Sequence, residues 1–368
     1  MPTHLPTFCT SLLLAIALAM NCCAALPAAS VVLSDEMVEG LVQGKRIEGV
    51  LLGVSHRPLA LLGRDGHLWL LQANEASRFD RSASRFHPYP PSEFRAALLR
   101  ELGDKYEVTG TTHYLIAHPR GQQSRWAERF EELYRSFIQY FSVRGFEPAT
   151  PPFPLAGIVC GSRGEFDRLA AVQVGVSPGV QGYYNPTSNR ITMYDMTGNR
   201  NSANWRWNAA VLIHEATHQM AFNTGIHNRY APTPTWVAEG LATLFEAPGV
   251  CDSRNHAQIA DRVNRLRLRA FRQVVAPRHR PELLAKMVAG DDLFHSDVQT
   301  AYAEAWALSF YLTETQPRQY GQYLKRTGSR PPFRQYTAAE RTADFTALFG
   351  DNWRMLEAQF LRFMAGVK

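Results

Sequence analysis

The chain has 368 residues, of which 45% are hydrophobic and 20% are charged. This length and composition allow a substantial buried core and exclude the highly charged, apolar-poor class of disordered chains. The formal net charge is +6, and a basic surface can attract nucleic acid or anionic lipid. However, the arginines are scattered, and the sequence contains no finger, basic-zipper or RNA-stacking signature. We therefore expect a folded globular protein without a nucleic-acid partner.

The N-terminal region contains a short apolar run at Ser11–Met20. The run is too short to span a bilayer as a mature helix and has the length of a signal-peptide core. Small residues follow it, although no Lys or Arg precedes it. We predict a signal peptide over residues 1–29, export to the periplasm or the outside of the cell, and no transmembrane span after processing. The alternative, a lipid anchor on Cys22 or Cys23, lacks the small preceding residues that such processing needs.

Two cysteines remain after the predicted processing, Cys160 and Cys251. An even pair in an oxidising compartment is compatible with one disulfide. Two separate buried thiols are equally compatible, because the distance between two side chains cannot be obtained from spacing in the sequence. The sequence leaves both possibilities open.

Residues 31–90 are predicted to form a small β-rich accessory region. Arg46–Val54 and Leu59–Gly63 have the composition of strands, and Leu68–Leu71 would be the returning partner of the second. The intervening Asp65-Gly66 is a turn signal, so we expect a hairpin here. No catalytic signature occurs in this region.

The remaining residues, 100–368, are predicted to form one catalytic domain. We expect strands first and helices later, with no internal repeat, which is typical of an α+β fold. The predicted elements are a strand pair in 106–117, an amphipathic helix at Trp126–Phe141, a buried strand at Leu155–Cys160, a helix at 162–172, a turn at Gly182–Pro186, a strand at Asn189–Asp195 and a mainly helical remainder from Asn204.

The motif His214-Glu215-Ala216-Thr217-His218 lies in a predicted helix of about residues 204–223. Asn204 is a possible N-cap, and Gly225 follows the helix end. Two histidines four residues apart project from the same face of a helix, so both imidazoles can reach one ion. Zinc accepts imidazole nitrogen, and a carboxylate beside the first ligand, Glu215, can act as general base toward a water whose pKa the metal lowers. The alternative is a pair of ordinary buried histidines.

A third ligand is available from a second predicted helix, Pro234–Glu246, with Thr235 as its expected N-cap. Glu239 follows His218 by 21 residues, which is enough chain for a loop and a return beside the first helix. A carboxylate oxygen would complete a His-His-Glu set and leave one position open for water.

These two segments resemble the gluzincin metallopeptidases, in which the His-Glu-x-x-His helix is followed by a helix that supplies a glutamate, often in a Trp-x-x-Glu-Gly-x-Ala context like that of Trp236–Ala242. The competing metzincin pattern needs Gly and His where this chain has Ala221 and Thr224. His227 is off that spacing and is expected to be a loop residue. From about Tyr106 to the C-terminus, the chain is also similar to a peptidase-MA-like family of exported bacterial proteins of unknown function. The matching stretches are Gly182–Pro186, Trp236–Ala242 and Tyr302–Leu308.

The resemblance implies a gluzincin or thermolysin-like fold with a small mixed sheet and a mainly helical C-terminal half, a Zn²⁺ cofactor and a peptide or protein substrate. Thermolysin-like relatives place Asp where this chain has Thr243. Two alternatives are open for Glu246: it orients a histidine in place of that Asp, or it is a surface carboxylate. Tyr302 is the candidate donor to the oxyanion, with Tyr230 as the second choice and a core position as the alternative for Tyr302. The strand Ile191–Tyr194 is expected either at a sheet edge that accepts an extended substrate or inside the sheet.

Overall fold

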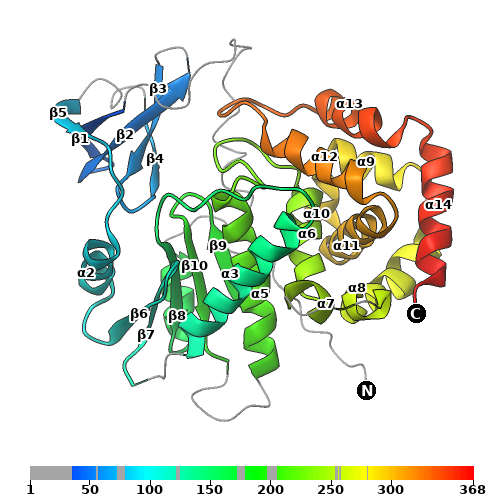
Figure 1. Cartoon of the computed structure of the whole chain (residues 1–368), viewed down its shortest axis with the longest axis horizontal. Coiled ribbons are helices and arrows are strands. Elements are labelled where there is room, and N and C mark those ends of the chain that lie inside the picture. The colour runs from blue at the N-terminus through cyan, green and yellow to red at the C-terminus, as the bar shows by residue number, and fades with distance from the viewer. Residues whose placement is uncertain are drawn as a thin grey trace. The chain divides into compact units, whose positions relative to one another are not determined.

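The computed structural model describes residues 35–54, 57–72, 79–121, 125–171, 179–196, 205–252, 256, 258–279 and 281–368. The predicted signal peptide and the possible N-cap Asn204 lie outside these residues. The described chain forms two compact units. The first unit draws on Met1–Glu131, Pro151–Asn208 and Pro331–Gln335, and the second on Glu132–Thr150, Ala209–Arg330 and Tyr336–Lys368. We describe each unit by itself (Figure 1).

The N-terminal part of the first unit is an antiparallel sheet with the strand order β4-β3-β2-β1-β5. The expected hairpin is confirmed, because β3 pairs with β4 across a turn in which Gly66 has a φ of 82°. This left-handed conformation favours glycine. The strands are β1 (Glu36–Val42), β2 (Lys45–Val54), β3 (Arg57–Gly63), β4 (Leu68–Leu70) and β5 (Phe79–Arg85).

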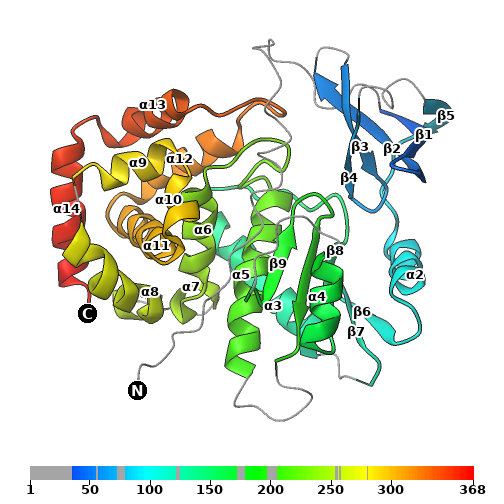
Figure 2. The same cartoon turned by 180° about the vertical axis from the view of Figure 1, so that it is seen from behind.

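A second sheet in the same unit is mixed, with the order β6-β7-β8-β10-β9. Strands β7, β8 and β10 are parallel, and β6 and β9 are antiparallel to their neighbours. Figure 2 shows α4 against this sheet. The elements are α2 (Pro91–Leu102), β6 (Tyr106–Gly110), β7 (Tyr114–Pro119), α3 (Arg125–Ser142), β8 (Leu155–Cys160), α4 (Arg163–Ala171), β9 (Gly182–Asn185) and β10 (Arg190–Tyr194).

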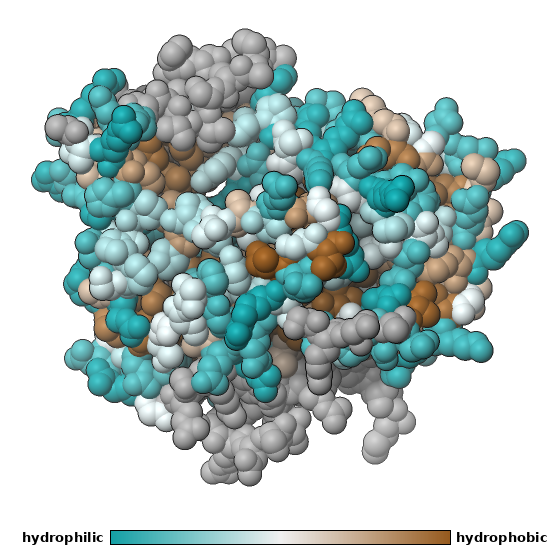
Figure 3. Space-filling model, viewed as in Figure 1, coloured by the Kyte–Doolittle hydropathy of each residue, from teal (hydrophilic) through white to brown (hydrophobic). Residues whose placement is uncertain are grey.

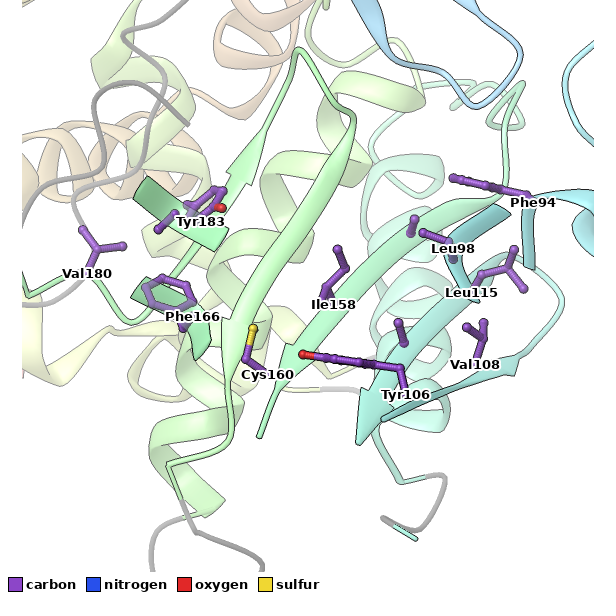
Figure 4. Close-up of a cluster of buried hydrophobic side chains, with 13 residues drawn as sticks. Phe94, Leu98, Tyr106, Val108, Leu115, Ile158, Cys160, Phe166, Val180 and Tyr183 are labelled. Carbon is purple, nitrogen blue, oxygen red and sulfur yellow. The ribbon is translucent and has the colours of Figure 1, made fainter. Parts of the chain in front are cut away.

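Alternation along the strands places a hydrophobic core on one face of the mixed sheet. Leu115 of β7 and Ile158 of β8 pack there with Phe94 of α2 and Phe166 of α4 (Figure 4). Tyr114, next to Leu115 in sequence, points the other way and contacts Phe130 of α3, with ring centroids 5.0 Å apart. The sheet is therefore covered on both faces, as expected for parallel strands.

At the end of this sheet, the structure corrects one prediction and decides between two alternatives that the sequence left open. The segment expected as a turn, Gly182–Pro186, forms β9 up to Asn185 and pairs with β10. The strand Ile191–Tyr194 belongs to β10, which lies between β8 and β9 and is therefore internal. The aromatic pair Tyr183-Tyr184 explains the wrong prediction of a turn, since both rings are buried and fit a strand better than a solvated turn.

The second unit consists of helices in its described residues. Figures 1 and 2 both show α6 beside α11. The helices from residue 205 onward are α5 (Trp205–Asn223), α6 (Thr235–Phe245), α7 (Pro248–Cys251), α8 (Arg265–Ala270), α9 (Leu283–Ala289), α10 (Asp292–Ser296), α11 (Val298–Thr315), α12 (Pro317–Gly328), α13 (Ala338–Phe349) and α14 (Trp353–Gly366). Trp236 of α6 anchors the core, stacking on Tyr323 and meeting Phe345 edge-on. The chain is thus mixed α/β with two small sheets, within the predicted class.

The visible surface is mainly hydrophilic with scattered apolar residues (Figure 3). Among the described residues, no helix has both the length and the apolar character needed to cross a bilayer. Cys160 and Cys251 are both free thiols, the first in the first unit and the second in the second unit. Of the two possibilities left open by the sequence, the structure therefore shows separate thiols.

Candidate metal centre

Helix α5 carries the first two candidate ligands and is buried on all sides from Val211 to Met220, apart from the partly exposed Ile213. The helix therefore lies in the interior of the protein together with its polar residues, which include His214, Glu215 and His218. It ends at Asn223, and Gly225 follows with a φ of 81°, which permits the chain to reverse. The predicted helix and its C-terminal signal are confirmed.

Helix α6 carries the third candidate ligand and crosses α11 at very close range. A Cβ atom added at Gly240 would lie 2.1 Å from Oγ of Ser309 and 2.8 Å from the carbonyl oxygen of Ala305. Only glycine permits this approach, and the crossing fixes the neighbouring Glu239 in the core. The N-cap prediction was wrong, because Thr235 is the first helical residue and its backbone N–H donates to Asp291, 3.0 Å away. A remote carboxylate therefore caps α6 in place of a local side chain.

The three candidate ligands converge on one point in the second unit. Nε2 of His214 lies 3.2 Å from Nε2 of His218 and 3.2 Å from Oε2 of Glu239, and the third separation, from Nε2 of His218 to Oε2 of Glu239, is 3.5 Å. All three side chains are buried. The ligand atoms of all three lie within 4.8 Å of one another. Among the described residues, no other three His, Cys, Asp or Glu side chains come together in this way.

The separations and the chemistry of the donors fit a zinc ion. A tetrahedral ion with ligands at about 2.0–2.1 Å separates its ligand atoms by about 3.3 Å, close to the distances found. The donor set of two imidazole nitrogens and one carboxylate oxygen is one that zinc accepts. In the described part of the chain, Oε1 of Glu239 and Nδ1 of His218 are buried without a hydrogen-bond partner. The arrangement is therefore able to bind a metal ion.

Glu246, at the C-terminal end of α6, fixes the orientation of His214. Its Oε1 lies 2.8 Å from Nδ1 of His214, and since a carboxylate only accepts hydrogen bonds, Nδ1 must carry the proton. When His214 is neutral, as a metal ligand must be, the lone pair of Nε2 then faces the other two ligands. Thr243, at the position where thermolysin-like proteins place Asp, instead donates to the backbone oxygen of Glu239. Of the two readings of Glu246, the structure supports the orienting role.

Two further residues hold Glu246, and sequence reasoning did not single them out. Nδ2 of Asn264 donates to Oε2 of Glu246 over 2.7 Å. The buried guanidinium of Arg267 lies 3.5 Å from Oε1 of the same carboxylate and also covers the ring of Tyr302 at 5.0 Å. These residues lie 18 and more positions beyond Glu246 and have no motif of their own, so the sequence carried no local signal for them.

The electrostatics of the centre couple the imidazoles to the carboxylates. Burial alone would lower the pKa of His214, but its hydrogen bonds to Glu239 and Glu246 raise it to about 10. Burial alone would raise the pKa of Glu239, but the charge of His218 and the hydrogen bonds from both histidines lower it to about 2. Burial would likewise raise the pKa of Glu246, and Arg267 with His214 lowers it below its usual range. The site thus keeps its carboxylates ionised, as ligands of a cation must be.

Of the remaining predicted site residues, Glu215 and Tyr302 lie near His214, and Tyr230 lies in a loop. Glu215 is fully buried on α5, and its charge acts on His214. Tyr302, near the start of α11, is buried with its ring stacked beside that of His214 at a centroid distance of 6.3 Å. Tyr230 lies in the loop between α5 and α6, where its backbone N–H donates to Asn228. The catalytic roles of these residues stay predictions.

Comparison with known proteins gives a family match and a likeness to solved structures. A family model described as a protein of unknown function (DUF1570) matches residues 208–334, the segment that contains all three candidate ligands. No curated protein matches the chain. Among solved structures, the chain is similar to an M1 zinc metallopeptidase mutant from Deinococcus radiodurans, with 17% identity and a TM-score of 0.39 over 72% of this chain and 52% of that one. The chain spans about half the length of that structure.

Proposed function

We propose that this chain is a zinc-dependent peptidase of the gluzincin type that acts outside the cytoplasm, with residues 100–368 as its catalytic domain and residues 1–29 as a signal peptide. The observation that carries the proposal is the convergence of Nε2 of His214, Nε2 of His218 and Oε2 of Glu239 at 3.2–3.5 Å from one another. Three protein ligands in a buried cluster leave one position of a tetrahedral ion for water or substrate, which distinguishes a catalytic from a structural zinc site.

The residues of the site divide the chemistry of hydrolysis among them. His214, His218 and Glu239 would hold the ion, and Glu246 would keep the first imidazole in the required tautomer. A zinc ion bound there would supply a Lewis acid and lower the pKa of water toward neutrality. Glu215, next to the first ligand, would accept a proton from the attacking water and deliver it to the leaving amine.

Peptide hydrolysis also needs a donor to the oxyanion that develops on the attacked carbonyl. We propose Tyr302 for this role because its ring lies directly beside that of His214. The contact of the same ring with the guanidinium of Arg267 favours a fixed orientation of the tyrosine.

The proposal is tested by metal analysis and by hydrolysis of a broad peptide library. Wild-type protein is expected to contain about one zinc per chain and to cleave peptides in a chelator-sensitive manner. The Glu215→Gln variant should keep the zinc and lose about 10²- to 10⁴-fold in rate, because it preserves the shape of the site and removes the general base. The Glu239→Ala variant should lose the zinc. A fully active Glu215→Gln variant would refute the mechanism.

The alternative from another class is a zinc-binding scaffold of the cell envelope that keeps the same fold without turnover. The same measurements separate the two functions. A wild-type protein that binds zinc tightly and cleaves no peptide of the library would support the scaffold. A buried Glu215 beside the ligands favours the enzyme, since a structural zinc site has no use for a general base.

A further inference from the structure

The loop after α5 returns a third histidine to the helix that carries the metal ligands. Gly225, with a φ of 81°, reverses the chain, and the backbone N–H of His227 donates to the carbonyl of Ala221 over 2.9 Å. The ring of His227 then meets the ring of Phe222 edge-on, with centroids 5.2 Å apart. Phe222 is four residues after His218 on the same helix face. His227 therefore lies one helical turn beyond a candidate metal ligand.

Neither ring nitrogen of His227 makes a well-formed hydrogen bond within the described chain, although the backbone of Ile226 interacts with the ring. The side chain is 1% exposed, and in the described residues neither Nδ1 nor Nε2 has a hydrogen-bond partner. Leaving buried polar atoms unpaired destabilises the folded protein. The loop cannot relax to solvate them, because Asn228 donates to the carbonyl of Arg330 and Tyr230 donates back to Asn228. An unpaired buried group in such a fixed position calls for a partner in the functional protein.

His218 lacks the support that His214 receives. Its Nε2 faces His214 and Glu239, so a metal ion would be bound through Nε2 and the proton would lie on Nδ1. That Nδ1 is buried and has no hydrogen-bond acceptor in the described chain. Metal-binding histidines almost always donate their second N–H to a carboxylate, a carbonyl or a water. His214 follows this rule through Glu246, and His218 requires an acceptor of its own.

We propose that His227 is the positioning residue of His218. A buried water would accept the hydrogen bond from Nδ1–H of His218 and donate one to a ring nitrogen of His227. This inference rests on the proposed zinc site. A neutral imidazole has one nitrogen that donates and one that accepts, so His227 is able to offer an acceptor. A water with several polar partners is an ordinary occupant of such a place.

Direct ligation by His227 is a different possibility and is disfavoured by the geometry. A fourth protein ligand would close the site and make it structural. In the described chain, the group of mutually close ligand atoms comprises His214, His218 and Glu239 and does not include His227.

The test compares zinc affinity among variants by competition with a chromophoric chelator. The variant His227→Phe retains an aromatic ring against Phe222 and removes the acceptor, so zinc should bind about 10- to 100-fold more weakly. The variant His227→Gln restores an amide oxygen and should recover most of the affinity. His279→Phe is the matched control, because both ring nitrogens of His279 are also buried without a hydrogen-bond partner in the described chain, while its neighbour is Glu357, 3.9 Å away. It should bind zinc like wild type.

A second readout reports on the hydrogen bond itself. In ¹⁵N-histidine-labelled, zinc-loaded protein, the Nδ1–H signal of His218 should exchange slowly in wild type and in His227→Gln, and be lost to fast exchange in His227→Phe. Equal zinc affinity and equal exchange in wild type and His227→Phe would overturn the inference and leave the peptidase proposal standing. Tight zinc binding without hydrolysis would refute the peptidase and still test His227. Failure of wild type to bind zinc would overturn both.

Discussion

The contact between Glu246 and His214 allows the most precise test of the metal centre. The two oxygens of Glu246 meet three donors: Nδ1 of His214 at 2.8 Å, Nδ2 of Asn264 at 2.7 Å and the guanidinium of Arg267 at 3.5 Å. The variant Glu246→Gln replaces one acceptor oxygen by an amide that donates, so at least one of the three donors then opposes another donor. The variant Glu246→Ala removes both acceptors.

The expected loss is set by the role of an orienting carboxylate at a metal ligand. Removing such a partner weakens metal binding by about 10- to 100-fold, which is about 1.4–2.7 kcal/mol. We expect Glu246→Gln near the lower limit and Glu246→Ala near the upper one. The alanine variant should also unfold more easily, because Arg267 stays buried without its counter-charge. Zinc affinity is measured by chelator competition at one pH, and stability by urea unfolding of the metal-free protein.

Glu314 provides the matched control for these variants. It also pairs with an arginine in the second unit, accepting from Nε and Nη2 of Arg262 over 2.8 and 2.7 Å. The described contacts of Glu314 include no histidine, so Glu314→Gln and Glu314→Ala should bind zinc like wild type. If Glu246→Ala binds zinc as tightly as wild type, or if Glu314→Ala loses as much affinity as Glu246→Ala, the orienting role is refuted.

Two further predictions concern the helices around the site. Burial, with a smaller contribution from the charge of Glu357, raises the pKa of Glu304 to about 8, so the folded protein binds a proton that the unfolded chain releases near pH 4.5. The contribution of Glu304 to stability should therefore fall by about 5 kcal/mol as pH rises from about 4.5 to about 8. Glu304→Gln should remove this contribution in urea unfolding at several pH values, and an unchanged slope would contradict the assignment. Gly240→Ala should destabilise the protein by about 1–3 kcal/mol, because its Cβ would meet Ser309 and Ala305 of α11. Gly164→Ala in α4, where a Cβ meets nothing within 4 Å, should be neutral or slightly stabilising, and equal thermal shifts in both would argue against the close crossing.

Local sequence patterns determined the elements that carry the site. The helix of His214 and His218 could be predicted because its apolar spacing and Gly225 act within a few residues, and the i, i+4 spacing alone puts both imidazoles on one face. The buried strand Leu155–Cys160 and the hairpin at Gly66 were predicted for the same reason. The segment Gly182–Asn185 was mispredicted because pairing with β10, rather than its own turn signals, decides its conformation.

Tertiary structure alone decided which side chains meet. The sequence offered Glu239 as a ligand but not its distance, which depends on the crossing of α6 and α11 at Gly240. It could not choose between a surface and an orienting role for Glu246, because Asn264 and Arg267 reach it from another part of the chain. It assigned His227 to a loop, and only the reversal at Gly225 brings that ring against Phe222. Spacing fixes neighbours within a helix, whereas contacts between helices depend on packing that no short segment encodes.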